Sequence, residues 1–136
     1  MVVLIDTNVV LDYLSLREGL YENAKKIMQL CVDGEIDGYI AFHTVPNVYY
    51  ILRTNFSASQ RREMLLELCD IVTVISANHS GVVKAIENDE FSDLEDCLQD
   101  ECAKMVRTDY IITRNIDDYK HSDTKAISPE DFLNLV

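Results

Sequence analysis

Carboxylates and amides of the kind that bind divalent metal ions occur in three separated parts of this 136-residue chain. One acid follows the apolar run at 2–5, two acids lie at the start of an amphipathic stretch, and an amide and an acid follow the apolar run at 110–113. These residues are Asp6, Glu95, Asp96, Asn115 and Asp118. Oxygen ligands suit Mg²⁺ or Mn²⁺, and such an ion can activate a water against a phosphodiester. The residue types therefore predict metal-assisted hydrolysis, provided that the fold brings them together.

Five short apolar runs predict the strands of a mainly parallel sheet. The first, Val2–Ile5, is continuously apolar and β-branched, which is typical of a strand buried on both faces. The other four are expected at 38–42, 71–75, 110–113 and 125–128. Stretches with helical spacing separate them, in the predicted order βααβααβαβαβα. This order predicts an α/β protein, a three-layer α/β/α sandwich with a central mainly parallel sheet, in which residues 1–136 form a single domain.

The same acids also have a purely structural interpretation. Asp6 could simply begin a helix, because Asp is a good N-cap. Ser92 and Glu95 have the spacing of a capping box, Asp93 could itself be the N-cap, and acids in a first turn suit the helix dipole. Asp12 is expected on the outer side of the short helix that follows Asp6. The wide separation of the acidic segments argues against mere capping, because the carboxyl ends of parallel strands lie at one edge of a sheet and bind ligands there.

Composition restricts the classes of partner. The chain has 24 acidic and 12 basic residues and a net charge of −12, which argues against indiscriminate binding of nucleic acid and favours a divalent cation or a basic protein partner. No apolar run approaches the ~20 residues of a membrane span, and the first residues lack the basic region of a signal peptide. The four cysteines form no CxxC pair and are predicted to be small core residues in a reducing compartment. We therefore expect a cytoplasmic protein without membrane contact.

Three segments of the chain resemble the PIN-domain family in order and spacing, from Val2 to Phe132. They are VVLIDTNVVLDYL, DLEDCLQDECA and YIITRNIDDY. Known PIN domains are α/β/α proteins with a central parallel sheet, and many are metal-dependent ribonucleases, including VapC-type toxins of bacterial toxin–antitoxin pairs. The resemblance implies an endoribonuclease that hydrolyses single-stranded RNA with Mg²⁺ or Mn²⁺. It also implies an antitoxin protein as partner and is compatible with a homodimer.

The resemblance assigns roles to individual residues. Asp6, Asp96 and Asp118 match family acids that bind the metal ion and act in catalysis, and Glu95 is a candidate substitute beside Asp96. Other residues are expected to contact the substrate or to orient these acids and the waters of the metal ion. They are Thr7, Asn8, Asn47, Thr113 and Asn115.

Two amides depart from the family pattern. Asn47 and Asn115 stand where many active members carry an acid, and an amide has no charge and cannot act as a general base. These replacements predict weaker metal binding and weaker cleavage. The alternative is a PIN-like RNA- or protein-binding module that is catalytically weak or inactive.

Two further alternatives and one partner surface follow from the sequence. A receiver-type phosphoacceptor domain needs a central-strand Asp and a strand-end Lys that the chain lacks. An acidic domain with well-capped helices and no site would place Asp6, Asp96 and Asp118 far apart. Arg61 and Arg62 lie in the first turn of a predicted helix, the unfavourable end for cations, and are therefore candidates for contact with a partner.

Overall fold

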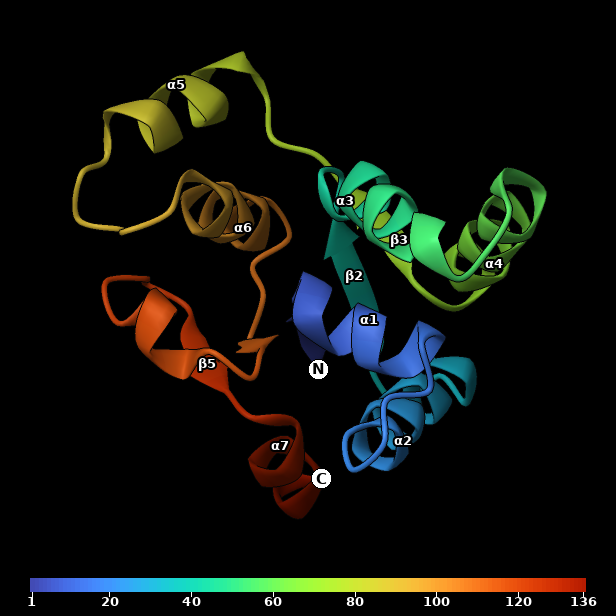
Figure 1. The fold of residues 1–136 in the computed structure, drawn as a ribbon. Helices are drawn as coiled ribbons and strands as arrows, with labels where there is room; N and C mark the ends of the chain where they lie inside the picture. The colour runs from blue at the N-terminus through green and yellow to red at the C-terminus, as the bar shows by residue number, and fades with distance from the viewer.

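The computed structural model describes residues 1–136 and consists of five strands, seven α-helices and two short 3₁₀ helices (Figure 1). The strands are β1 (Val2–Ile5), β2 (Asp37–Ala41), β3 (Thr73–Ile75), β4 (Tyr110–Ile112) and β5 (Lys125–Ile127). The helices are α1 (Thr7–Leu14), α2 (Tyr21–Val32), α3 (Thr44–Ile51), α4 (Ala58–Ile71), α5 (His79–Glu87), α6 (Leu94–Met105) and α7 (Pro129–Leu135), with the 3₁₀ helices η1 (Leu52–Thr54) and η2 (Ile116–Tyr119). No helix combines the length and the apolarity that crossing a membrane requires.

All five strands are parallel and lie in the order β3-β2-β1-β4-β5, which confirms the predicted α/β sheet. The central strand β1 pairs on one side with β2 and on the other with β4, where Ile5 lies beside Ile112. The chain builds outward from β1 in one direction through β3 and then returns to add β4 and β5. Ligands of open α/β sheets bind outside the carboxyl ends of the strands at such a reversal. Here that position lies between the ends of β1 and β4.

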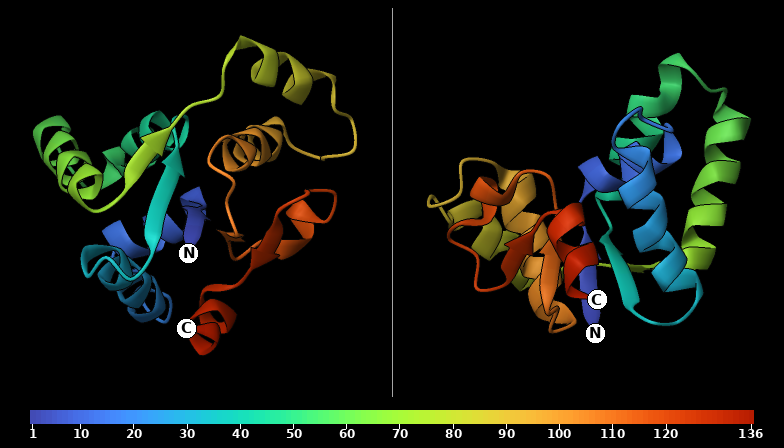
Figure 2. Two further views of the ribbon diagram at one scale, coloured as in Figure 1. Left: turned by 180° about the vertical axis from the view of Figure 1, so that it is seen from behind. Right: turned by 90° about the horizontal axis from the view of Figure 1, so that it is seen from below.

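Helices cover both faces of the sheet, as the three-layer prediction requires (Figure 2). Helices α1, α2, α3, α4 and α7 pack on one face, and α5 and α6 pack on the other. Strand side chains alternate between these layers: Val3 and Ile5 join the first core, whereas Leu4 joins the second. Both faces of β1 are therefore buried, which explains its unbroken apolar sequence.

Side-chain caps fix where α1 and α6 begin. Asp6 caps α1 and accepts a hydrogen bond from the Thr7 amide. The prediction that this acid begins a helix is therefore confirmed. Asp93, rather than Ser92, caps α6 by accepting from the Glu95 amide. The cap of α1 positions the carboxylate of Asp6 at the carboxyl end of β1.

Three details differ from the sequence prediction. The predicted helix between the fourth and fifth strands is wrong, because only η2 lies there. Strand β3 begins at Thr73, because α4 continues to Ile71. Of the cysteines, Cys97 and Cys102 lie in the core, Cys31 is half-buried and Cys69 is exposed, so the core prediction fails for Cys69.

Candidate active site

Side chains from all three acidic segments line one cleft at the carboxyl end of the sheet. Its wall contains three amide side chains and one apolar side chain, that of Leu11, but no Lys or Arg. The five carboxylates of the cleft belong to Asp6, Asp93, Glu95, Asp96 and Asp118. The alternative in which the acids lie far apart is therefore excluded, whereas their roles as ligands or catalysts stay predictions.

The carboxylate of Asp6 is buried and accepts hydrogen bonds from five other residues, of which Asn8 makes the longest contact. Its Oδ1 accepts from the Thr7 amide at 2.7 Å and from Gln99 Nε2 at 3.2 Å. Its Oδ2 accepts from the Thr113 hydroxyl at 2.8 Å and from the Tyr119 hydroxyl at 3.0 Å. Burial raises the pKa of Asp6, while the hydrogen bonds from Thr113, Tyr119 and Thr7 lower it. These contacts fix the orientation of Asp6 before any ligand binds.

Asp96 faces Asp6 from the first turn of α6. The Tyr119 hydroxyl that donates to Asp6 also lies 3.4 Å from Asp96 Oδ1, so one phenol lies between the two carboxylates. The pKa of Asp96 is raised to about 7, because burial disfavours its charged form and Asp6, Asp118 and Asp93 repel it. Burial and the carboxylates of Asp6 and Asp96 raise the pKa of Tyr119. The phenol therefore keeps its proton and remains a hydrogen-bond donor.

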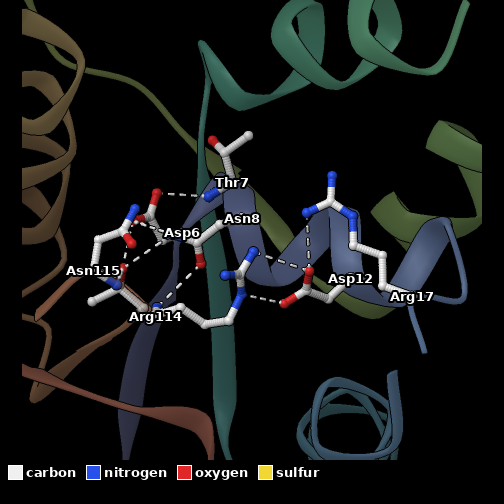
Figure 3. A network of polar contacts seen from close by, with 8 residues as sticks. Asp6, Thr7, Asn8, Asp12, Arg17, Arg114 and Asn115 are labelled. Carbon is white, nitrogen blue, oxygen red and sulfur yellow. Dashed lines mark hydrogen bonds and ion pairs between the residues drawn. The ribbon is translucent and has the colours of Figure 1, made fainter. Parts of the chain in front are cut away.

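The loop after β4 contacts the start of α1 beside Asp6 (Figure 3). Asn8 Nδ2 lies 3.3 Å from both Asp6 Oδ2 and Thr113 Oγ1. The side-chain Oδ1 of Asn8 accepts from the backbone N–H of Arg114, and the backbone N–H of Asn115 donates to Thr113 Oγ1. Thr7, Asn8 and Thr113 thus all contact Asp6, as residues that orient this acid would, and Asn115 lies in the cleft wall.

At the rim of the cleft, Asn47 contacts one of the acids. Asn47 lies near the start of α3, and its Nδ2 donates to Glu95 Oε1 at 3.1 Å. Glu95 lines the cleft, whereas Asn47 does not. Asn47 itself carries no charge, but the hydrogen bond places the carboxylate of Glu95, on α6, beside it.

Gln99 and Thr44 complete the support of Asp6, and sequence reasoning missed both. Gln99 is only 1% exposed; its Nε2 donates to Asp6 and lies 3.4 Å from Thr44 Oγ1, while its Oε1 is buried without a partner. Thr44 also shares a 2.8 Å hydrogen bond with the Thr7 hydroxyl. One signal for Gln99 was available, because a residue three positions after Asp96 lies on the same face of a helix.

A second polar network lies behind the cleft, and it overturns the prediction for Asp12 (Figure 3). Asp12 was expected on the outer side of its helix but is 1% exposed. Arg114 donates to it from Nε at 2.7 Å and from Nη2 at 3.2 Å, and Arg17 Nη1 lies 3.3 Å away. Because a buried carboxylate needs such partners, Asp12 can turn inward only when Arg114 lies over it.

The donor set of the cleft fits a divalent cation that keeps several of its waters. Five carboxylates face a wall without Lys or Arg, and burial lowers the pKa of nearby His43, which keeps that ring uncharged near pH 7. No three His, Cys, Asp or Glu side chains are grouped closely enough to hold an ion by themselves. Mg²⁺ does not need such a group, because it usually uses one or two carboxylates and retains waters. Asp6, Asp96 and Asp118 stay the predicted ligands, and those that do not reach the ion directly would bind it through its waters.

Comparisons with known proteins agree with this geometry. A family model described as PIN domain matches residues 2–117. No curated protein matches the chain at a significant level. Several solved structures are similar over most of the chain, at identities that indicate a shared fold.

One of these structures is VapBC2 from Rickettsia felis bound to a promoter DNA fragment, with 12% identity, a TM-score of 0.67, and coverage of 94% of this chain and 98% of that one. A toxin–antitoxin complex from Klebsiella pneumoniae has 21% identity, a TM-score of 0.68 and coverage of 93% and 97%. Mycobacterium tuberculosis VapC20, a toxin that cleaves the sarcin–ricin loop, has 13% identity, a TM-score of 0.63 and coverage of 80% and 86%.

Proposed function

We propose, from the premise that this chain belongs to the PIN-domain family, that it is a cytoplasmic Mg²⁺- or Mn²⁺-dependent endoribonuclease that hydrolyses single-stranded RNA. The observation that carries the proposal is the pairing of Asp6 with Asp96 around one buried hydroxyl, in a cleft that has five carboxylates and no Lys or Arg. Such a cleft repels a phosphate unless a cation is also bound. The RNA-cleaving activity named for VapC20 supports RNA as the substrate.

Each acid has a role that its position supports. Asp6, oriented by its hydrogen bonds, together with Asp96 and Asp118 would hold the ion. When bound, a divalent ion offsets the negative charge of the scissile phosphate and makes a nearby water more acidic. Asp96 or Glu95 would orient the attacking water from the first turn of α6.

We expect the activity to be weak but present. Asn115 lines the cleft as an uncharged amide and can offer only its carbonyl oxygen to a cation or water. The hydrogen bond between Asn47 and Glu95 supports Glu95 as a substitute for an acid on α3, because it holds this carboxylate beside the position of the missing one.

We further propose that the protein acts as the toxin of a toxin–antitoxin pair. The similar structures from Rickettsia felis and Klebsiella pneumoniae are toxin–antitoxin assemblies. A basic side chain of an antitoxin would complement the acidic cleft, and the net charge of −12 favours a basic partner in general. Co-purification with the product of a neighbouring gene tests this part of the proposal.

Cleavage of an unstructured, fluorescently labelled RNA in the presence of Mn²⁺ tests the enzyme directly. The wild type should cut the RNA, and a chelator should stop it. Asp96→Asn should remove the activity without unfolding the chain, because Asn is tolerated near a helix N-terminus. Equal cleavage by wild type and Asp96→Asn would show that the activity is not that of this cleft. Mn²⁺ binding without cleavage of any RNA would favour the non-cleaving binding module.

A further inference from the structure

Acidic and basic residues are unevenly distributed along this acidic chain. All 24 acidic residues lie outside residues 38–62, whereas three of the 12 basic residues lie within this range. These three are Arg53 in η1 and Arg61 and Arg62 at the start of α4. None of them forms an ion pair, although Arg17, Lys104 and Arg114 do. Residues 38–62, from within β2 to the start of α4, therefore carry only positive charge on an otherwise negative molecule.

The three arginines are arranged around two tyrosines of α3, and we call these five residues the arginine–tyrosine surface. The guanidinium carbon of Arg53 lies 3.7 Å from the ring centroid of Tyr50. Those of Arg61 and Arg62 lie 4.1 Å and 5.8 Å from the ring centroid of Tyr49. Arg61 also donates to the Tyr49 carbonyl oxygen at 2.8 Å, which explains why a cation is tolerated in the first turn of α4.

Part of this surface remains free to bind a ligand. Tyr50 is 61% exposed, although Arg53 stacks against its ring. Arg53 uses one of its five donors on the Tyr50 carbonyl oxygen, and Arg62 is exposed and makes no hydrogen bond within the chain. An exposed ring beside unpaired guanidinium groups can stack a nucleobase and contact phosphates.

Helix α3 leads from the candidate active site to this surface. Thr44, the first residue of α3, contacts Thr7 and Gln99 in the cleft. Asn47 contacts Glu95 at the rim, and Tyr50 follows it three positions later, on the same face of the helix. A strand of RNA that leaves the cleft along α3 therefore meets Tyr50 and then Arg53.

We propose that the arginine–tyrosine surface binds single-stranded RNA beside the cleft, with a base stacked on Tyr50 and phosphates paired with Arg53 and Arg62. This inference rests on the proposed function, because it takes RNA as the substrate. Single-stranded RNA is favoured over a protein partner because it supplies both groups that the surface fits, a flat base and a phosphate. The acid-free segment also has no carboxylate of its own to repel a phosphate.

Fluorescence anisotropy with a labelled single-stranded oligouridylate, in metal-free low-salt buffer, tests the surface without cleavage. Arg53→Ala/Arg62→Ala should weaken binding about tenfold or more. It should also reduce the steepness of log K against log salt concentration by about 1.4, since each phosphate contact on a single strand contributes about 0.7. The matched control is Lys25→Ala/Lys26→Ala on α2, which removes the same charge and also takes a cation from a tyrosine, since Lys25 lies 5.8 Å from the ring of Tyr21. That control should change binding less than twofold.

Substitution of the stacking residue separates contact from charge. Tyr50→Ala should weaken RNA binding with little change in the salt dependence, whereas Tyr50→Phe should bind as the wild type does. The proposal is overturned if the wild type binds no RNA, if the α2 control weakens binding as much as the arginine variant, or if the arginine variant alters only self-association measured by light scattering. If the wild type neither binds Mn²⁺ nor cleaves RNA, but binds RNA and loses this binding in the arginine variant, the RNA-binding surface is supported and only the nuclease proposal is rejected.

Discussion

The hydroxyl of Tyr119 lies 3.0 Å from Asp6 Oδ2, and this contact joins the end of β1 to the loop that follows β4. The same hydroxyl reaches Asp96 on α6, so a single buried phenol touches two of the three acids proposed to hold the metal ion. A hydroxyl has only one proton to donate, so the two carboxylates cannot both receive it at once. Asp96 therefore has the longer contact with this hydroxyl, and its pKa is raised because burial and the neighbouring carboxylates disfavour its charged form.

Tyr119→Phe should keep the fold and weaken the organisation of the cleft. The ring remains in the core, but Asp6 loses one of its donors, so the free energy of unfolding should fall by about 1–2 kcal/mol. Urea denaturation measures this change. The matched control is Tyr110→Phe, at a ring that packs on Phe132 away from the acids. Equal losses in both variants would show that the contact with Asp6 is not what matters.

The stability of the metal-free protein should fall as the pH rises toward neutrality. Asp96 has a folded-state pKa of about 7 against an ordinary value of 3.8, so the folded protein binds more protons than the unfolded chain between these values. Its stabilising contribution is fully present below about pH 4 and is lost as the pH rises through 7. The melting temperature of Asp96→Asn should lack this component. Identical pH profiles for wild type and Asp96→Asn would contradict the account.

Arg114→Ala should destabilise the chain far more than Arg17→Ala. Arg114 makes two hydrogen bonds with buried Asp12, at 2.7 Å and 3.2 Å, whereas Arg17 makes one contact at 3.3 Å. Loss of the main partner leaves a buried charge and should cost about 2–4 kcal/mol, against less than about 1 kcal/mol for Arg17. Adding Asp12→Asn to Arg114→Ala should recover part of the loss in urea denaturation. Additive losses would show that the two residues do not act as a pair.

Asn47→Glu should tighten Mn²⁺ binding and lower the stability of the metal-free protein. The new carboxylate replaces an amide that donates to Glu95, so it would repel this acid until a cation binds. We expect a Kd for Mn²⁺ about tenfold lower by calorimetry and faster RNA cleavage. Asn47→Gln keeps the amide and serves as the control. A less stable protein with unchanged Mn²⁺ affinity would show that α3 does not reach the ion.

The fold was predictable from local patterns to a large degree. The unbroken apolar run before Asp6 predicts a strand buried on both faces, and the helical stripes between the runs predict crossover connections. The apolar pattern does not reveal that the chain between β4 and β5 forms only the short helix η2. Tyr119 is buried there, but no apolar residues at helical spacing surround it. Asp12 was misplaced because its burial depends on Arg114, a partner from a distant loop.

The candidate site was predictable only in its acids. Asp6, Asp96 and Asp118 are recognisable from their positions relative to strands and helices. Their support comes from contacts between distant segments, such as Gln99 with Asp6; helical spacing places Gln99 on the face of Asp96 but does not indicate its contact with Asp6. The role of Tyr119 could not be predicted either, because core packing explains a tyrosine at this position as well as its hydrogen bond to Asp6 does.

Anomalous diffraction from crystals grown with Mn²⁺ tests the central claim most directly, because it locates the ion without reference to catalysis. The account predicts one Mn²⁺ peak in the cleft, within contact distance of Asp6 or Asp96 and with Asp118 reached directly or through a water. Under the same conditions the peak should be absent or greatly weakened in Asp96→Asn. A peak at a site away from these acids, or no peak at saturating Mn²⁺, would contradict the account.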